Sequence, residues 1–128
     1  MVDKARAPVS SRRGDEAEAQ ALAHLQAQGL RLVERNYRVA RGPRSRGGEI
    51  DLILRDRDGT LVFVEVRSRS RHQEGGAAAS IGSRKIDRLR FAAQHYLARL
   101  PQLPRCRFDV VAIDNGCIEW IPAAFDGA

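Results

Sequence analysis

Three carboxylic acids, Glu49, Asp51 and Glu65, stand in two neighbouring apolar segments of the sequence. Carboxylates that are placed close together repel one another and lose hydration, so a cation must compensate them. Hard divalent cations such as Mg²⁺ prefer carboxylate oxygens and keep waters that a phosphate group can replace. Such a cation also stabilises charge on a phosphodiester in its transition state. These residue types therefore indicate a site for Mg²⁺ or Mn²⁺ and the hydrolysis of phosphodiester bonds.

The two segments that carry these acids, 49–56 and 60–67, are predicted to form an antiparallel hairpin. Their connection, 57–59, ends in Gly59, which accepts the left-handed conformation that the third loop position requires. One face of this hairpin is predicted to be apolar throughout, and it consists of Ile50, Leu52, Leu54, Val62, Val64 and Val66. The other face carries apolar residues beside the charges, so helices are expected on both faces of the sheet.

The length of the hairpin loop also predicts which charged residues face each other. Counting outward from the loop places Asp51 opposite Glu65 and Glu49 opposite Arg67. Cross-strand partners share a face, as do residues two apart, so all four side chains are predicted at one end of one face. The alternative to a metal is that Arg67 neutralises the acids in an ordinary ion-pair network.

The remaining elements are predicted from apolar periodicity and from turn residues. A single domain is expected over 14–128, after a flexible basic tail over 1–13. The predicted order is helix, three strands, helix and two strands, and the elements outside the hairpin are a helix over 15–28, a strand over 30–38, a helix over 83–100, and strands over 106–114 and 117–121.

The composition favours a polyanionic partner. The chain has 128 residues, a net charge of +6 and a pI of about 10.3, and most of its basic residues are arginine. Guanidinium groups form bidentate contacts with phosphate, so DNA or RNA is an expected partner. A basic surface without such a partner is the alternative.

The same sequence favours a cytoplasmic protein with no membrane partner. No window approaches the ~18 apolar residues of a membrane span, and the first thirteen residues lack the apolar centre of a signal peptide. Cys106 and Cys117 have neither zinc-site spacing nor the density of a disulfide framework. Both cysteines are expected to be reduced and buried.

Arginines cluster on either side of the acidic residues in the sequence. They are predicted to bind phosphates on both sides of the metal site. A solvated basic face is the alternative. The arginines of these clusters are Arg38, Arg41, Arg44 and Arg46 before the hairpin, and Arg69 and Arg71 after it.

Several sequence strings resemble one known family. The strings GEIDLI at 48–53 and FVEVRSR at 63–69 resemble the YraN family of small uncharacterised bacterial proteins. The similarity extends over most of the chain. It includes Ala17-Glu18, the string RNYR at 35–38, Lys85, the string RFDVV at 107–111 and Ala124-Phe125.

That family is similar to restriction-endonuclease-like nucleases, especially archaeal Holliday-junction resolvases. The resemblance implies a three-layer α/β core with a mixed sheet of about five strands. It also implies an acidic residue on the first helix, an aspartate on the second strand and a Glu-x-Lys on the third. In this sequence those places fall on Glu18, Asp51 and Glu65, with Glu49 as a further metal ligand or a neighbour.

One position departs from the family pattern. Arg67 stands where the family has the lysine of Glu-x-Lys. Arginine stays protonated, so it can stabilise transition-state charge but cannot act as a base. Lys85, at the start of the second helix, is the candidate to take over the function of that lysine. The alternative is that Lys85 is simply an exposed residue at the start of the helix.

Three functions are consistent with these features. The first is a nucleic-acid-binding protein with a Mg²⁺-dependent endonuclease site that acts on branched DNA, with DNA favoured over RNA. The second is a non-catalytic nucleic-acid-binding adaptor that keeps the nuclease fold, and Arg67 favours it. The third is a protein-interaction domain whose acids form a structural ion-pair network. Nucleases that cut two strands are often dimers, so a homodimer is one of the oligomeric states left open.

Overall fold

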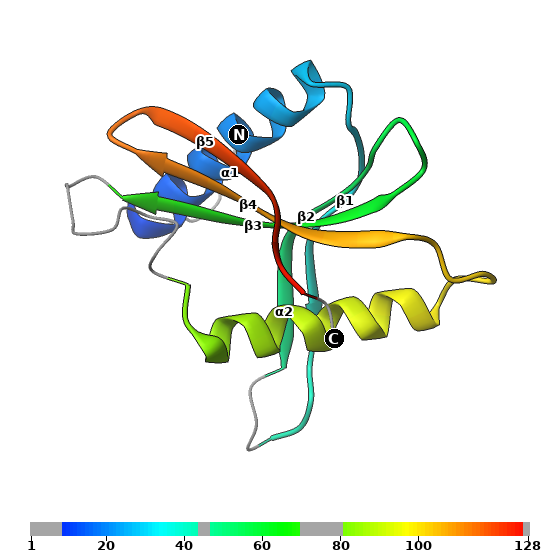
Figure 1. Cartoon of the computed structure of the whole chain (residues 1–128). Coiled ribbons are helices and arrows are strands. Elements are labelled where there is room, and N and C mark those ends of the chain that lie inside the picture. Colours follow the sequence, from blue (N-terminus) through cyan, green and yellow to red (C-terminus); the bar gives the residue numbers. More distant parts are fainter. Residues whose placement is uncertain (1–8, 44–46, 70–80, 127–128) are drawn as a thin grey trace, which may run out of the picture.

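A computed structural model describes residues 9–43, 47–69 and 81–126 of the chain. The five strands form one sheet in the order β1-β2-β3-β4-β5, in which only β3 and β4 run parallel. The elements follow one another in the predicted order (Figure 1): α1 (Val9–Ala27), β1 (Arg31–Val39), β2 (Gly48–Arg55), β3 (Leu61–Arg69), α2 (Ser83–Ala98), β4 (Cys106–Asp114) and β5 (Cys117–Phe125).

The two helices cover opposite faces of this sheet (Figure 1). Parallel strands need a long crossover, and α2 supplies it between β3 and β4. On one face, Ala21 and Leu25 of α1 pack on Val62 and Val64. On the other face, α2 packs on Phe63 and its neighbours. The predicted three-layer α/β fold with a mixed five-stranded sheet is confirmed.

Both predicted hairpin turns are present. Pairing of Leu52 with Val64 and of Arg55 with Leu61 follows the predicted register. Gly59 has a φ of 91° at the end of the first turn. In the second turn, Asn115 and Gly116 have φ values of 50° and 84°, as a two-residue type I′ turn requires.

Two predictions about element boundaries and faces are corrected. Helix α1 begins at Val9, so residues 9–13 of the predicted tail are helical. Ile50 packs with Ile53 against α2, whereas Leu52 lies on the α1 face. The alternation of β2 therefore breaks around Asp51, and Ile50 does not belong to the apolar face that strict alternation predicted.

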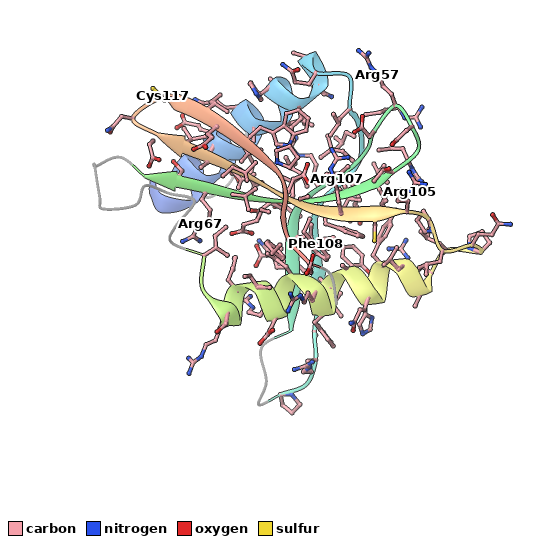
Figure 2. The ribbon with its side chains drawn as sticks, viewed as in Figure 1. Arg57, Arg67, Arg105, Arg107, Phe108 and Cys117 are labelled. Carbon is pink, nitrogen blue, oxygen red and sulfur yellow. The ribbon has the colours of Figure 1, made fainter. Side chains whose placement is uncertain are left out.

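The prediction that the cysteines are buried is also wrong. Cys106 and Cys117 are free, as expected, but both are exposed. Cys106 is the first residue of β4, at the rim of the sheet. Cys117 begins β5 directly after a turn, at the tip of the β4–β5 hairpin (Figure 2), so apolar neighbours in sequence cover neither cysteine. In the described part of the chain, neither helix has the length and apolar character needed to cross a membrane.

Candidate active site

Strands β2 and β3 separate beyond Leu52 and Val64. Their pairing ends there, although β3 continues beside β4 as far as Arg69 (Figure 1). The backbone N–H of Val66 donates to Oδ2 of Asp51 at 2.8 Å, instead of to a backbone carbonyl of β2. A buried N–H needs an acceptor, and the carboxyl group of Asp51 provides one where the ladder has ended. The fork between the two strands is the base of the candidate site.

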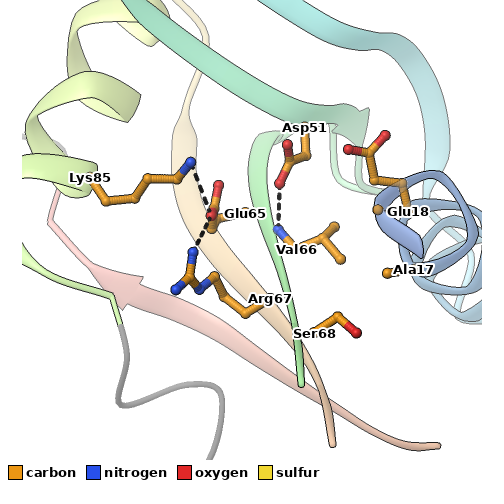
Figure 3. A pocket seen from close by; sticks show the side chains of 9 residues that line it. Ala17, Glu18, Asp51, Glu65, Val66, Arg67, Ser68 and Lys85 are labelled. Carbon is orange, nitrogen blue, oxygen red and sulfur yellow. Dashed lines mark hydrogen bonds and ion pairs between the residues drawn. The ribbon is translucent and has the colours of Figure 1, made fainter. Parts of the chain in front are cut away.

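A cavity of about 290 Å³ lies at this fork, between the two helices (Figure 3). Asp51 comes from β2, and Glu65 and Arg67 come from β3. Glu18 approaches from α1, and Lys85 approaches from the first turn of α2. The fold therefore brings together five of the residues that the sequence singled out, from four different elements.

Glu65 is the most enclosed acid of the cavity, with only 2% of its surface exposed. Its Oε2 lies 3.5 Å from Nζ of Lys85 and 3.6 Å from Nη1 of Arg67. Burial raises the pKa of Glu65 to about 8, and the neighbouring charge of Asp51 adds to the rise. The two cations oppose this shift without cancelling it. Glu65 is therefore under-compensated even with two ion pairs.

The carboxyl groups of Asp51 and Glu65 line the same cavity and act on each other's pKa. Burial raises the pKa of Asp51, while the N–H of Val66, the contact with Glu65 and the charge of Lys85 act in the opposite direction. Two ionised carboxylates in one buried cavity repel each other, so a bound proton or a cation stabilises the pair.

Glu18 faces this pair from the other side of the cavity (Figure 3). Burial raises its pKa to about 7, and the charges of Asp51 and Asp15 raise it further. Arg35 and a side-chain hydrogen bond with Asn36 act in the opposite direction. Among the described residues, the buried side-chain oxygens without a hydrogen-bond partner are Oε1 of Glu18 and Oε1 of Glu65.

Sequence reasoning did not identify Asn36 as a site residue. It lies within β1, across from Asp51, and its φ of 52° departs from extended backbone. This left-handed conformation is costly for most residues and is adopted by asparagine more readily than by others. An asparagine inside a strand is itself unusual, and that was the available signal. Its conformation coincides with its contact to Glu18.

Replacing Asn36 with glycine is expected to raise the pKa of Glu18 above 7. Glycine keeps the positive φ but removes the amide that stabilises the ionised carboxylate. Asn36→Ala should show the same rise and also lose about 1 kcal/mol of unfolding free energy, because alanine is strained in this conformation. Carboxyl NMR titration and urea unfolding measure the two effects. Asn115→Gly is the matched control, and an unchanged Glu18 pKa in both Asn36 variants would contradict this role.

The structure does not bring Glu49 into the cavity. Glu49 is ion-paired with Arg38 of β1 at 3.8 Å and with Arg88 of α2 at 3.7 Å, and it is not among the lining residues. The predicted pairing of Glu49 with Arg67 is therefore wrong, although the charge of Glu49 still raises the pKa of Asp51. The reason is that the pairing of β2 with β3 ends at the fork, whereas β2 stays paired with β1 as far as Gly48.

The predicted phosphate-binding arginines are only partly described. Arg38 is exposed and contacts Glu49, and the guanidinium of Arg41 lies 4.2 Å from the centre of the Phe91 ring on α2. Arg41 therefore lies beside α2, whereas Arg38 shares the carboxylate of Glu49 with Arg88 of that helix. Those that lie outside the described residues are Arg44, Arg46, Arg71 and the side chain of Arg69.

The donor set fits a divalent cation that is shared with a substrate. In the described part of the chain, no three His, Cys, Asp or Glu side chains are grouped so as to hold a metal by themselves. Mg²⁺ does not require such a cage, because one or two carboxylates, waters and substrate phosphates complete its coordination. The Asp51–Glu65 pair and the unpartnered Oε1 of Glu65 meet that smaller requirement.

Known proteins resemble this chain over most of its length. The model of the uncharacterised protein family UPF0102 matches residues 17–113, which include the acids and cations of the cavity. A UPF0102 protein of Methylibium petroleiphilum is 62% identical over 115 residues, which cover 90% of this chain and 94% of that protein. A relative from Paracidovorax citrulli is 62% identical over 113 residues, covering 88% and 82% of the two chains. One from Albidiferax ferrireducens is 55% identical over 123 residues, covering 96% and 94%. The resemblance to the YraN family is thereby confirmed, and the chain belongs to this uncharacterised family, UPF0102.

Proposed function

We propose that the protein binds nucleic acid and hydrolyses phosphodiester bonds with Mg²⁺ or Mn²⁺ held by Asp51 and Glu65. The observation that carries the proposal is the buried carboxyl pair, in which Glu65 keeps an unpartnered Oε1 beside two cationic side chains. Buried polar atoms are almost always hydrogen-bonded, and strongly perturbed acids in a cavity are typical of functional sites. A purely structural network would satisfy both oxygens.

The residues of the chain would divide the work by their chemistry. A bound Mg²⁺ or Mn²⁺ would supply Lewis-acid stabilisation of phosphate charge. Lys85 and Arg67 both lie where they can bind phosphate oxygens. Arg67 can do so only as a cation and cannot act as a base, because its guanidinium group does not deprotonate. Glu18, with a pKa of about 7, is suited to accept or donate a proton near neutral pH.

The basic character of the chain supports nucleic acid as the substrate class. The net charge of +6 provides long-range attraction for a polyanion. Arg41 lies beside α2, the helix that also supplies Lys85 to the cavity, and Arg38 shares Glu49 with Arg88 of the same helix. Branched DNA is the preferred form because the resemblance to junction-resolving nucleases implies it. The affinity of the protein for DNA should therefore fall steeply as salt is added.

Titration of Mn²⁺ into the purified protein by calorimetry tests the proposal. Heat of binding is expected in the wild type and should disappear in Asp51→Asn and in Glu65→Gln. Repeating the titration in buffers of different ionisation enthalpy should show proton release, because the cation competes with protons for Asp51 and Glu65, whose pKa values are raised. Glu49→Gln is the matched control and should keep the heat, since Glu49 lies outside the cavity.

The non-catalytic adaptor is the second candidate, and one observation favours it. Both Lys85 and Arg67 already contact the same oxygen of Glu65, as permanent occupants of a metal's place would. The adaptor predicts salt-sensitive DNA binding with no heat of Mn²⁺ binding, either in the free protein or in its DNA complex. That combination of results would end the nuclease proposal.

A further inference from the structure

Three arginines surround a second cavity, of about 410 Å³, at the opposite end of the sheet. We call it the arginine cavity. Figure 2 shows Arg57, which lines it, on the other side of the molecule from Arg67 of the carboxyl cavity. The two cavities share no residue. The arginine cavity is lined by Gly29, Arg31, Arg55, Asp56, Arg57 and Gly59.

Two of these arginines face each other across neighbouring strands. Arg31 of β1 is the direct partner of Arg55 of β2. Like charges directly opposite in a sheet are destabilising unless an opposite charge compensates them. Within the described residues, neither Arg31 nor Arg57 forms an ion pair, and the guanidinium of Arg55 donates to the carbonyl of Gly59 at 3.0 Å.

The one acid in the lining is already engaged. Oδ1 of Asp56 accepts the backbone N–H of Arg57 at 2.7 Å. Its Oδ2 accepts Nη1 of Arg107 at 3.0 Å, and this arginine also pairs with the fully buried Asp109. One oxygen of Asp56 therefore binds within the hairpin, and the other binds an arginine of β4. The three guanidinium groups of the cavity lack a carboxylate of their own.

Gly29 lies beside the guanidinium of Arg57 at the cavity. Helix α1 ends in a Schellman motif, in which Leu30 donates to Leu25 and Gly29 donates to Gln26, and Gly29 has a φ of 100°. A Cβ at Gly29 would collide with Nε of Arg57, so the guanidinium lies directly against the backbone of this turn. Arg57 is exposed, and its contact with this turn places its guanidinium beside the cavity.

We propose that the arginine cavity is a binding site for a phosphate-bearing ligand. Guanidinium forks match phosphate oxygens in pairs, and three of them around one cavity supply the positive charge that a phosphodiester or a pyrophosphate requires. The phosphate can belong to a free nucleotide or to a nucleic-acid backbone. The site is independent of the carboxyl pair and of any metal, so it does not rest on the proposed nuclease function.

Titration with inorganic pyrophosphate in the presence of EDTA tests this site. Amide NMR signals of Gly29 and Gly59 are expected to shift saturably, while signals around Glu65 stay unchanged. Arg31→Gln and Arg57→Gln should each weaken binding roughly tenfold, as the loss of a charge-assisted hydrogen bond implies. Arg84→Gln, an equal change of charge on an exposed position of α2, should bind like the wild type. Absence of shifts at Gly29 and Gly59, or an equal loss in Arg84→Gln, would overturn the proposal.

Competition identifies the source of the phosphate. Displacement of pyrophosphate by adenosine diphosphate would support a nucleotide site. Displacement by a short single-stranded oligonucleotide, with adenosine diphosphate ineffective, would support a contact with the nucleic-acid backbone. A cavity that binds pyrophosphate but releases it to neither competitor would overturn the assignment of the ligand class. Since EDTA removes divalent cations throughout, none of these outcomes depends on whether the carboxyl cavity is active.

Discussion

The metal-free protein is expected to lose roughly 2–4 kcal/mol of unfolding free energy between pH 5 and pH 8. Burial raises the pKa of Glu65 to about 8 and that of Glu18 to about 7, both from an ordinary value of 4.5. The folded protein therefore binds protons more tightly than the unfolded chain does. The stability from this difference is complete below pH 4.5 and is lost as the pH rises through 7 and 8. Glu18 contributes less than Glu65, because it is only half-buried and water screens its charge.

Urea unfolding at several pH values in EDTA measures this loss. Glu65→Gln should remove most of the pH dependence, because an amide keeps the shape of the side chain without titrating. Asp87→Asn is the control, since the Asp87 side chain is 74% exposed and should leave the pH dependence unchanged. A flat stability profile in the wild type would show that Lys85 and Arg67 fully compensate Glu65.

Added Mn²⁺ extends the same experiment to the proposed function. A cation binds the ionised carboxyl pair in competition with protons, so it should restore stability at pH 8 and have little effect at pH 5. The gain should vanish in Glu65→Gln. If the pH dependence is present but Mn²⁺ has no effect, the carboxyl pair is strained for a reason other than metal binding, and the adaptor remains.

The sequence predicted the hairpin accurately because its constraints are local. A three-residue loop with Gly59 at its end allows one register, and the pairing of Leu52 with Val64 follows it. The fork that opens beyond this pair could not be predicted. It depends on the bond between the Val66 N–H and the Asp51 carboxyl group, which forms only when strand β2 turns away from β3.

The difference between local constraints and contacts that are distant in sequence also explains the errors about Glu49 and Ile50. Alternation along a single strand assigned both residues to faces, but their partners come from β1 and α2, which are distant in sequence. Glu18 was placed by family resemblance alone, because no local pattern predicts where α1 crosses the sheet. The arginine cavity was not anticipated for a similar reason, since it joins Arg31 to the 55–59 turn through strand pairing.

Under the proposed nuclease function, replacing Lys85 with methionine is expected to slow cleavage of branched DNA by roughly 10²–10³-fold, the cost of removing one preorganised charge from a phosphate site. Lys85 acts on both acids, because its charge lowers the pKa of Asp51 as well as that of Glu65. Its loss should therefore weaken metal binding at neutral pH and also remove a phosphate contact. Arg67→Met should have a smaller effect, since the charge of Lys85 lowers the pKa of Glu65 more strongly than that of Arg67 does.

Single-turnover cleavage at pH 7 and pH 9 separates the two contributions of Lys85. Raising the pH ionises the carboxyl pair without the help of the ammonium group, so metal binding should recover in Lys85→Met. The contact with phosphate cannot recover, and a residual deficit at pH 9 measures it. Arg84→Gln, on the neighbouring position of α2, controls for general loss of DNA affinity. If Arg67→Met proves more damaging than Lys85→Met at both pH values, the arginine has kept the role of the family's lysine. Lys85 would then only help to hold Glu65 in place.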